Sequence, residues 1–264
     1  MLQKRYEGFL NTPCLWKNKA VFDLPPFEIT SKCKSIDIAV DETLRLGKYV
    51  ERLVSFELQQ HKGITILAEN IQIQNNRITL GELDCLLLKD DKPIHLEIIY
   101  KFYLYDASIG NSEIEHFIGP NRTDSLIEKL DKLKEKQLPL LYSDACKHYL
   151  HEFNLEARSI SQQVYFKAQL FLPYADENIQ LQTLNNDCVL GFYINQNQLN
   201  SFKDYKFFIP IKKDWLITPH SNVDWLRFET FKEITKDYFR QKYSSLCWMK
   251  YNTGVIKRVF LVWW

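Results

Sequence analysis

The chain has 264 residues, of which 45% are hydrophobic and 25% are charged, so it holds enough apolar material for a packed core and is not a disordered protein. Its 34 basic and 33 acidic residues give a net charge of +1, which excludes the overall positive field of a dedicated duplex-DNA-binding domain. Any contact with nucleic acid must therefore come from a local group of residues.

The cysteines are scattered and form no C-x-x-C pair, a pattern that argues against a zinc ribbon or a disulfide framework: Cys14, Cys33, Cys85, Cys146, Cys188 and Cys247. We expect free thiols. The first residues lack the continuous apolar stretch of a signal peptide, and no run of 18 apolar residues occurs. The sequence therefore predicts a soluble, cytoplasmic protein without membrane contact, and it leaves the oligomeric state open.

The first 42 residues follow no regular period. Pro13, Pro25 and Pro26 interrupt any long helix, while several apolar side chains are available as anchors, namely Trp16, Phe22, Leu24 and Phe27. We expect an irregular N-terminal extension that wraps the core and carries no chemistry.

Residues 43–60 carry apolar side chains at helical spacing in two adjacent stripes, which predicts a buried helix. Glu51 and Glu57 stand within these stripes, where the period would place apolar residues. Each is either a helix-surface carboxylate or a group kept near a site, and the pattern alone does not choose between these alternatives.

Three strands are expected next. Residues 64–74 read as a strand and Asn75-Asn76 as a turn, after which residues 78–104 form two apolar runs joined by Asp90-Asp91-Lys92-Pro93. This is typical of a β-hairpin with a loop of about four residues.

Charged side chains interrupt both arms of this hairpin. Asp84 lies on the first arm, and Glu97 and Lys101 share one face of the second because strand side chains alternate with a period of two. Buried charges need partners, and two carboxylates from neighbouring strands form an oxygen-rich site suited to Mg²⁺ or Mn²⁺. A structural ion pair at the edge of a sheet is the simpler alternative.

The middle of the chain predicts a loop, a helix and a further strand. Residues 106–122 form a long loop, and the helix that follows carries Leu126, Leu130, Leu133 and Gln137 at helical spacing before Pro139 ends it. Gln137 is either a site residue on the buried face or a glutamine that bonds stray carbonyl groups of the last turn. A second helix is expected at 145–153, and strict alternation predicts a strand at 164–172.

The C-terminal part, residues 175–264, predicts strands at 189–194 and 205–211, a helix at 224–241 and a hairpin turning at 252–254. It contains five of the six tryptophans together with several lysines. These aromatic residues form either a stacking platform for single-stranded nucleic acid or, more commonly, part of the core.

The order of several motifs resembles a known family. The segments LGKYVERLVSFELQ, AENIQI, LGELDCLL, HLEIIYKFYL, IGPNRTDSL and KQLPLL, within residues 44–141, are similar to the bacterial domain-of-unknown-function family 1853. The pattern G-x-x-x-E, GELD and a later glutamate with a lysine nearby also resembles the PD-(D/E)XK nuclease superfamily. This implies a mixed α/β fold with a restriction-endonuclease-like core of helix, three strands, helix and strand. We expect this core and the N-terminal extension in residues 1–174, and an aromatic-rich α+β extension in residues 175–264.

The resemblance also implies roles for individual residues. Asp84 and Glu97 would bind Mg²⁺ or Mn²⁺, with Glu51 and Gln137 supporting the site. The lysine of the superfamily pattern falls at Ile99, so Lys101 would have to reach back toward Glu97. Lys129 lies at the margin of the helix face that carries Gln137, where it either contacts a phosphate of a nucleic acid, DNA rather than RNA, or, more commonly, faces solvent. Arg122 is a weaker candidate for the same contact. The displaced lysine leaves the alternative of an inactive nuclease-like fold that binds nucleic acid or protein.

Overall fold

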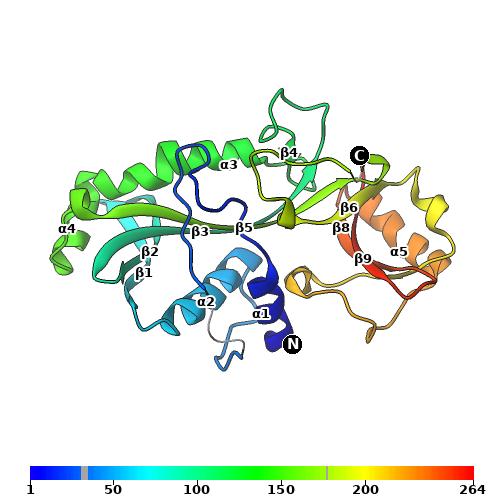
Figure 1. Cartoon of the computed structure of the whole chain (residues 1–264), viewed down its shortest axis with the longest axis horizontal. Helices are drawn as coiled ribbons and strands as arrows, with labels where there is room; N and C mark the ends of the chain where they lie inside the picture. Colours follow the sequence, from blue (N-terminus) through cyan, green and yellow to red (C-terminus); the bar gives the residue numbers. More distant parts are fainter. Residues whose placement is uncertain (31–34, 177) are drawn as a thin grey trace. The chain divides into compact units, whose positions relative to one another are not determined.

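The computed structural model describes residues 1–30, 35–176 and 178–264, which form two compact units (Figure 1). The hairpin unit comprises residues 14–100 and 128–167, and the terminal unit comprises residues 1–13, 101–127 and 168–264. The division differs from the one expected at residue 174, because the chain passes from one unit to the other within two long strands. The expected hairpin and its neighbouring strand therefore each contribute a segment to both units.

The hairpin unit is built on antiparallel strands. Helix α2 (Leu46–Gln59) precedes β1 (Ile64–Asn75), β2 (Ile78–Lys89) and β3 (Lys92–Tyr105), and β5 (Ser161–Pro173) follows β3 in the strand order. The turn between β2 and β3 has two residues, not about four, because Lys92 and Pro93 already pair with Lys89 and Leu88. Asp90 and Asp91 both have positive φ, as a two-residue hairpin turn requires.

Helical segments cover both sides of these strands. α2 lies on one side, and α3 (Leu126–Lys132) with the segments that follow lies on the other (Figure 1). These segments are a π-helical turn at Leu133–Gln137, a 3-10 turn at Leu138–Tyr142, α4 (Asp144–Glu152) and a 3-10 turn at Ala157–Ser159. A core cluster joins β1 and β2 to the 3-10 turn and α4 through Ile73, Leu83, Leu86, Leu140, Leu141, Cys146, Leu150 and Ile160.

The free edge of β5 in the hairpin unit is covered by the N-terminal segment. The backbone N–H groups of Leu15 and Phe27 donate to the carbonyls of Phe166 and Val164 at 2.7 and 2.8 Å. The ring of Trp16 packs against Phe166, so the apolar anchors of this segment are used as the sequence predicts. Cys33 lies outside the described residues.

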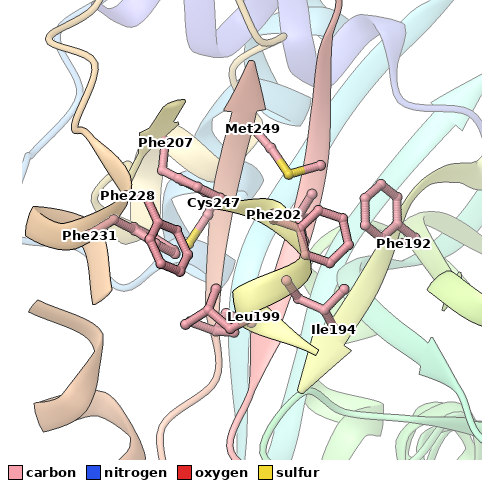
Figure 2. Close-up of a cluster of buried hydrophobic side chains, with 11 residues drawn as sticks. Phe192, Ile194, Leu199, Phe202, Phe207, Phe228, Phe231, Cys247 and Met249 are labelled. Atoms are coloured by element: carbon pink, nitrogen blue, oxygen red, sulfur yellow. The ribbon is translucent and has the colours of Figure 1, made fainter. Parts of the chain in front are cut away.

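The terminal unit contains the remaining elements, which are α1 (Leu2–Asn11), β4 (Phe117–Ile118), β6 (Val189–Asn195), β7 (Lys206–Phe208), α5 (Phe228–Arg240), β8 (Ser245–Lys250) and β9 (Ile256–Val262). Short 3-10 turns lie at Tyr174–Asp176, Asn186–Cys188, Leu199–Phe202 and Lys212–Leu216. The strand order is β5-β6-β9-β8-β7, with β6 parallel to both β5 and β9. Figure 2 shows a cluster of buried aromatic and aliphatic side chains between these strands and α5.

One expectation for this unit needs correction, and one alternative that the sequence left open is decided in part. The N-terminus is not irregular throughout, because residues 2–11 form a helix before Pro13 and bury Tyr6 and Phe9. Trp215 and Trp248 are each only 1% exposed, so for these two tryptophans the more common alternative, a place in the core, holds. The fold as a whole is mixed α/β with a mostly sheet core. Among the described residues, no helix combines the length and the apolar character needed to span a membrane.

Candidate functional site

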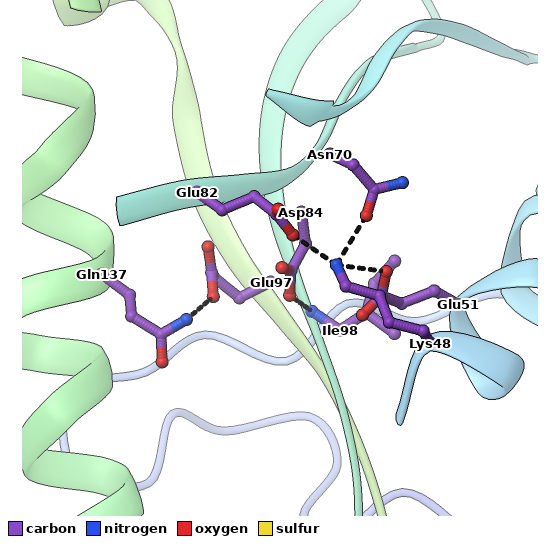
Figure 3. A network of polar contacts seen from close by, with 8 residues as sticks. All are labelled: Lys48, Glu51, Asn70, Glu82, Asp84, Glu97, Ile98 and Gln137. Carbon is purple, nitrogen blue, oxygen red and sulfur yellow. Dashed lines mark hydrogen bonds and ion pairs between the residues drawn. The ribbon is translucent and has the colours of Figure 1, made fainter. Parts of the chain in front are cut away.

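The site lies where β2 and β3 separate. Their backbone pairing runs from Lys89↔Lys92 to Cys85↔Leu96, and the next residues on the two strands are Asp84 and Glu97. There the Ile98 N–H donates to Asp84 Oδ2 at 2.9 Å. The Asp84 carboxylate thus replaces the backbone carbonyl of a neighbouring strand as the acceptor for this N–H group. The two predicted carboxylates are therefore brought together at the fork between the strands (Figure 3).

Asp84 is in an environment that disfavours its charged form. Burial and, after it, the negative charge of Glu97 raise the pKa of Asp84 to about 7, although the Ile98 N–H opposes this shift. Within the described part of the chain, the second oxygen of Asp84 has no hydrogen bond. A cation placed beside this oxygen would remove the repulsion between the two carboxylates.

Glu97 is fully buried and its two carboxylate oxygens are held by different donors. Gln137 Nε2 donates to one oxygen at 2.6 Å, and the ring of His95 lies 3.1 Å from the other. His95 is also fully buried, on the same strand face as Glu97. The carboxylate is thus fixed in position by one side chain on its own strand and one on the helical side of the unit.

Gln137 reaches Glu97 from the end of a π-helical turn, an irregularity that often occurs at functional sites. Its amide oxygen accepts a hydrogen bond from Lys129 Nζ at 2.8 Å. Gln137 therefore lies beside Glu97, and Lys129 contacts Gln137 from the side away from Glu97. The ammonium of Lys129 also favours the charged form of Asp84.

A lysine from α2 completes the site on its other side. The ammonium of Lys48 donates to Glu51 at 2.9 Å, to Asn70 at 2.8 Å and to Glu82. Burial alone would lower the pKa of Lys48, but the hydrogen bonds to Glu82 and Glu51 outweigh it and raise this pKa. Figure 3 shows Asp84 between this group and Glu97.

Asn70 has an unusual backbone for a strand residue. Its neighbours Glu69 and Ile71 pair with Cys85 and Leu83, which places Asn70 opposite Asp84, yet its φ is 55°. Asparagine adopts this left-handed conformation more readily than most residues, but it still costs free energy and such strain concentrates at functional sites. The conformation coincides here with the hydrogen bond to Lys48.

Glu51 pairs with Lys48 near Asp84, with only 14% of its side chain exposed. Burial raises its pKa, and the hydrogen bond from Lys48 partly offsets this effect. Glu57, the other candidate on the same helix, is buried elsewhere and accepts a hydrogen bond from the Tyr165 hydroxyl at 2.9 Å. The structure therefore separates the two glutamates that helical periodicity left equivalent.

Two predicted residues have other partners. The Lys101 ammonium, expected to reach back toward Glu97, bonds instead to Asp124 at 2.6 Å within the terminal unit. Asp124 belongs to the loop before α3, and the alternation of side chains along a strand gives no information on where a loop residue lies. Arg122 pairs with Asp106 and stacks on the ring of Trp264 at 4.0 Å, so its charge is already compensated.

Sequence reasoning missed five side chains of this site, two of which, Asn70 and Glu82, accept hydrogen bonds from Lys48. Lys48 stands three residues before Glu51, a spacing at which helix side chains meet, and that spacing was a usable signal. His95 stands two residues before Glu97 on the same strand face, and it was equally readable. Gln162, which contacts His95, is 67 positions distant in the sequence and has no local signal.

The carboxylates fit a magnesium or manganese ion better than a closed metal centre. Among the described residues, no three His, Cys, Asp or Glu side chains are arranged to hold a metal ion. Mg²⁺ is commonly held by only one or two carboxylates, with water and substrate phosphate as its other ligands. Asp84 and Glu97 supply two carboxylates of this kind, without the Cys and His ligands typical of a zinc site.

Comparison with known proteins identifies a family and no closer relative. No curated protein and no solved structure matches the chain. A family model described as a domain of unknown function matches residues 23–262, which include every residue of the site. Since this match covers most of the chain, the protein belongs to the domain-of-unknown-function family DUF1853.

Proposed function

We propose that the protein is a metal-dependent nuclease that hydrolyses phosphodiester bonds with a restriction-endonuclease-like core. The observation that carries this proposal is the pair of carboxylates, Asp84 and Glu97, at the fork between β2 and β3. Burial and, after it, the negative charge of Glu97 raise the pKa of Asp84, which is the behaviour expected of a cation site. The order of α2, three antiparallel strands, α3 and β5 supports the assignment of the core.

Each residue of the site then has a role. Asp84 and Glu97 hold Mg²⁺ or Mn²⁺, and a bound ion of this kind polarises a phosphate oxygen and lowers the pKa of a bound water. Gln137 fixes the orientation of Glu97. Lys48 supplies the ammonium that the superfamily pattern would place at Ile99, and it orients the attacking water or stabilises phosphate charge. Glu51, Glu82 and Asn70 position Lys48.

The Lys48 assignment rests on its contacts. Its ammonium is held by two carboxylates and an amide next to Asp84, whereas Lys101 is held by Asp124. A lysine held on three sides has lost most of its rotamer freedom, so little entropy remains to be lost when it contacts a phosphate. We assign the role to Lys48 on this basis, and we take DNA as the first substrate and RNA as the second.

Cleavage assays test the proposal directly. Labelled duplex and single-stranded DNA and RNA are incubated with the parent protein and either Mg²⁺, Mn²⁺ or EDTA. Cleavage that requires the metal and is lost in Asp84→Asn, Glu97→Gln and Lys48→Met is the expected result. Lys147→Met is the matched control, because Lys147 also pairs with an acid three residues away on a helix but lies on the surface of α4.

Two observations favour a second candidate, an inactive nuclease-like module that binds nucleic acid or protein. The Lys48 ammonium is already neutralised by two carboxylates, and the described residues contain no group of three metal-binding side chains. A parent protein that cuts none of the substrates and gains no thermal stability from either metal would support this second function and contradict the first.

A further inference from the structure

The hydrogen bonds around Glu97 have a direction that the structure determines. Gln162 Nε2 donates to the backbone carbonyl of Leu138 at 2.6 Å, and a carbonyl oxygen can only accept. This fixes which end of the Gln162 amide is the nitrogen. The same nitrogen lies 2.9 Å from His95 Nδ1, so Nδ1 must be the acceptor.

The protonated ring nitrogen of neutral His95 then follows from its neighbour. With Nδ1 accepting from Gln162, the ring proton is on Nε2, which lies 3.1 Å from a Glu97 oxygen and donates to it. The opposite side of Glu97 is determined in the same way. Lys129 can only donate to Gln137 Oε1, so the Gln137 amide nitrogen faces the other oxygen of Glu97.

We propose that His95 is a positioning residue, held by Gln162 as an Nε2–H donor that sets the orientation of the Glu97 carboxylate in the site. This inference rests on the proposed function, because the orientation matters through the cation that Glu97 holds together with Asp84. Partners that orient a metal ligand in this way set its direction and its affinity for the ion. The alternative is a buried histidine whose hydrogen bonds serve stability alone.

The burial and the hydrogen bonds of the His95 and Glu97 side chains support a positioning role. His95 and Glu97 are both fully buried, and each has its polar atoms bonded to side chains that approach from different elements. A carboxylate with one donor on each oxygen cannot rotate about its terminal torsion without breaking a hydrogen bond. The oxygen lone pairs that remain are therefore presented in one direction.

Two variants of Gln162 separate these alternatives. Gln162→Leu removes the donor to Nδ1 and leaves the imidazole in place, whereas Gln162→Glu presents an acceptor to Nδ1 and should move the ring proton there. Tyr165→Phe is the matched control, because Tyr165 lies on the same strand as Gln162, and the substitution removes a different buried hydrogen bond, the one to the Glu57 carboxylate. The measurements are Mn²⁺ affinity by calorimetry and the nitrogen resonances of ring-labelled histidine, assigned with His95→Gln.

The parent protein should show a single His95 tautomer with the proton on Nε2. Gln162→Glu should lose this tautomer, and both Gln162 variants should weaken Mn²⁺ binding roughly 10- to 100-fold, with Tyr165→Phe unchanged in both measurements. A proton on Nδ1 in the parent, or parent-like Mn²⁺ affinity in Gln162→Leu, overturns the inference. If the parent binds no Mn²⁺, the proposed function fails and the carboxyl resonance of Glu97 decides the positioning role: a shift in Gln162→Leu supports it, and an unchanged resonance overturns it.

Discussion

Replacing Asp84 by asparagine should stabilise the protein at neutral and alkaline pH. The substitution keeps an oxygen that can accept from the Ile98 N–H but removes the charge that burial and Glu97 disfavour. The pKa of Asp84 rises from its ordinary 3.8 to about 7. At about 1.36 kcal/mol per pH unit, this corresponds to at most ~4 kcal/mol of unfolding free energy.

The sign of the pH dependence follows from the raised pKa. Because the folded protein binds the Asp84 proton more tightly than the unfolded chain does, this group stabilises the fold below about pH 4, and the contribution is lost as the pH rises toward about 7. The advantage of Asp84→Asn should therefore be absent near pH 4, grow between pH 4 and 7, and stay constant above that range.

Urea unfolding of both proteins in EDTA from pH 4 to pH 8 measures this difference. Asp144→Asn is the control of opposite sign, because Lys147 lowers the pKa of the exposed Asp144 and its removal should not stabilise the protein at high pH. A stability difference between parent and Asp84→Asn that is independent of pH, or a variant less stable than the parent at pH 8, would refute the reasoning.

Three further outcomes are expected. Mg²⁺ or Mn²⁺ should raise the thermal midpoint of the parent and leave that of Asp84→Asn unchanged, and equal shifts in both would contradict the assigned ligands. In urea unfolding, Asn70→Ala should be less stable than Asn70→Gly by ~1–2 kcal/mol, because only glycine adopts the positive φ of this position without strain; equal stabilities would remove the strain argument. Gly8→Ala should destabilise the terminal unit by ~1–3 kcal/mol in thermal melts, since its new Cβ would stand 1.8 Å from the Leu216 carbonyl oxygen, and a parent-like melt would contradict this close approach.

The sequence by itself determined the elements around the site. Alternation of apolar residues predicted the strands from residue 64 to residue 104, and helical spacing predicted the helix before them, because both periods depend only on local backbone geometry. The carboxylates Asp84 and Glu97 were also readable, since a charge within an apolar strand is conspicuous. The family resemblance, which rests on the order of short motifs, selected Glu51 over Glu57 and singled out Gln137.

Only the tertiary structure decided which side chains meet. Lys48 is 22 residues from Asn70 and 34 residues from Glu82, and their contact depends on how α2 packs against β1 and β2. Gln162 meets His95 because β5 lies next to β3, a pairing that no local period specifies. Lys101 shares a strand face with Glu97, but its ammonium bonds to Asp124, which comes from a loop that the strand period does not place. Local periods fix the face of an element, whereas contacts between residues distant in sequence depend on packing between elements. That packing brought Lys48 to Asn70 and Glu82, and Gln162 to His95.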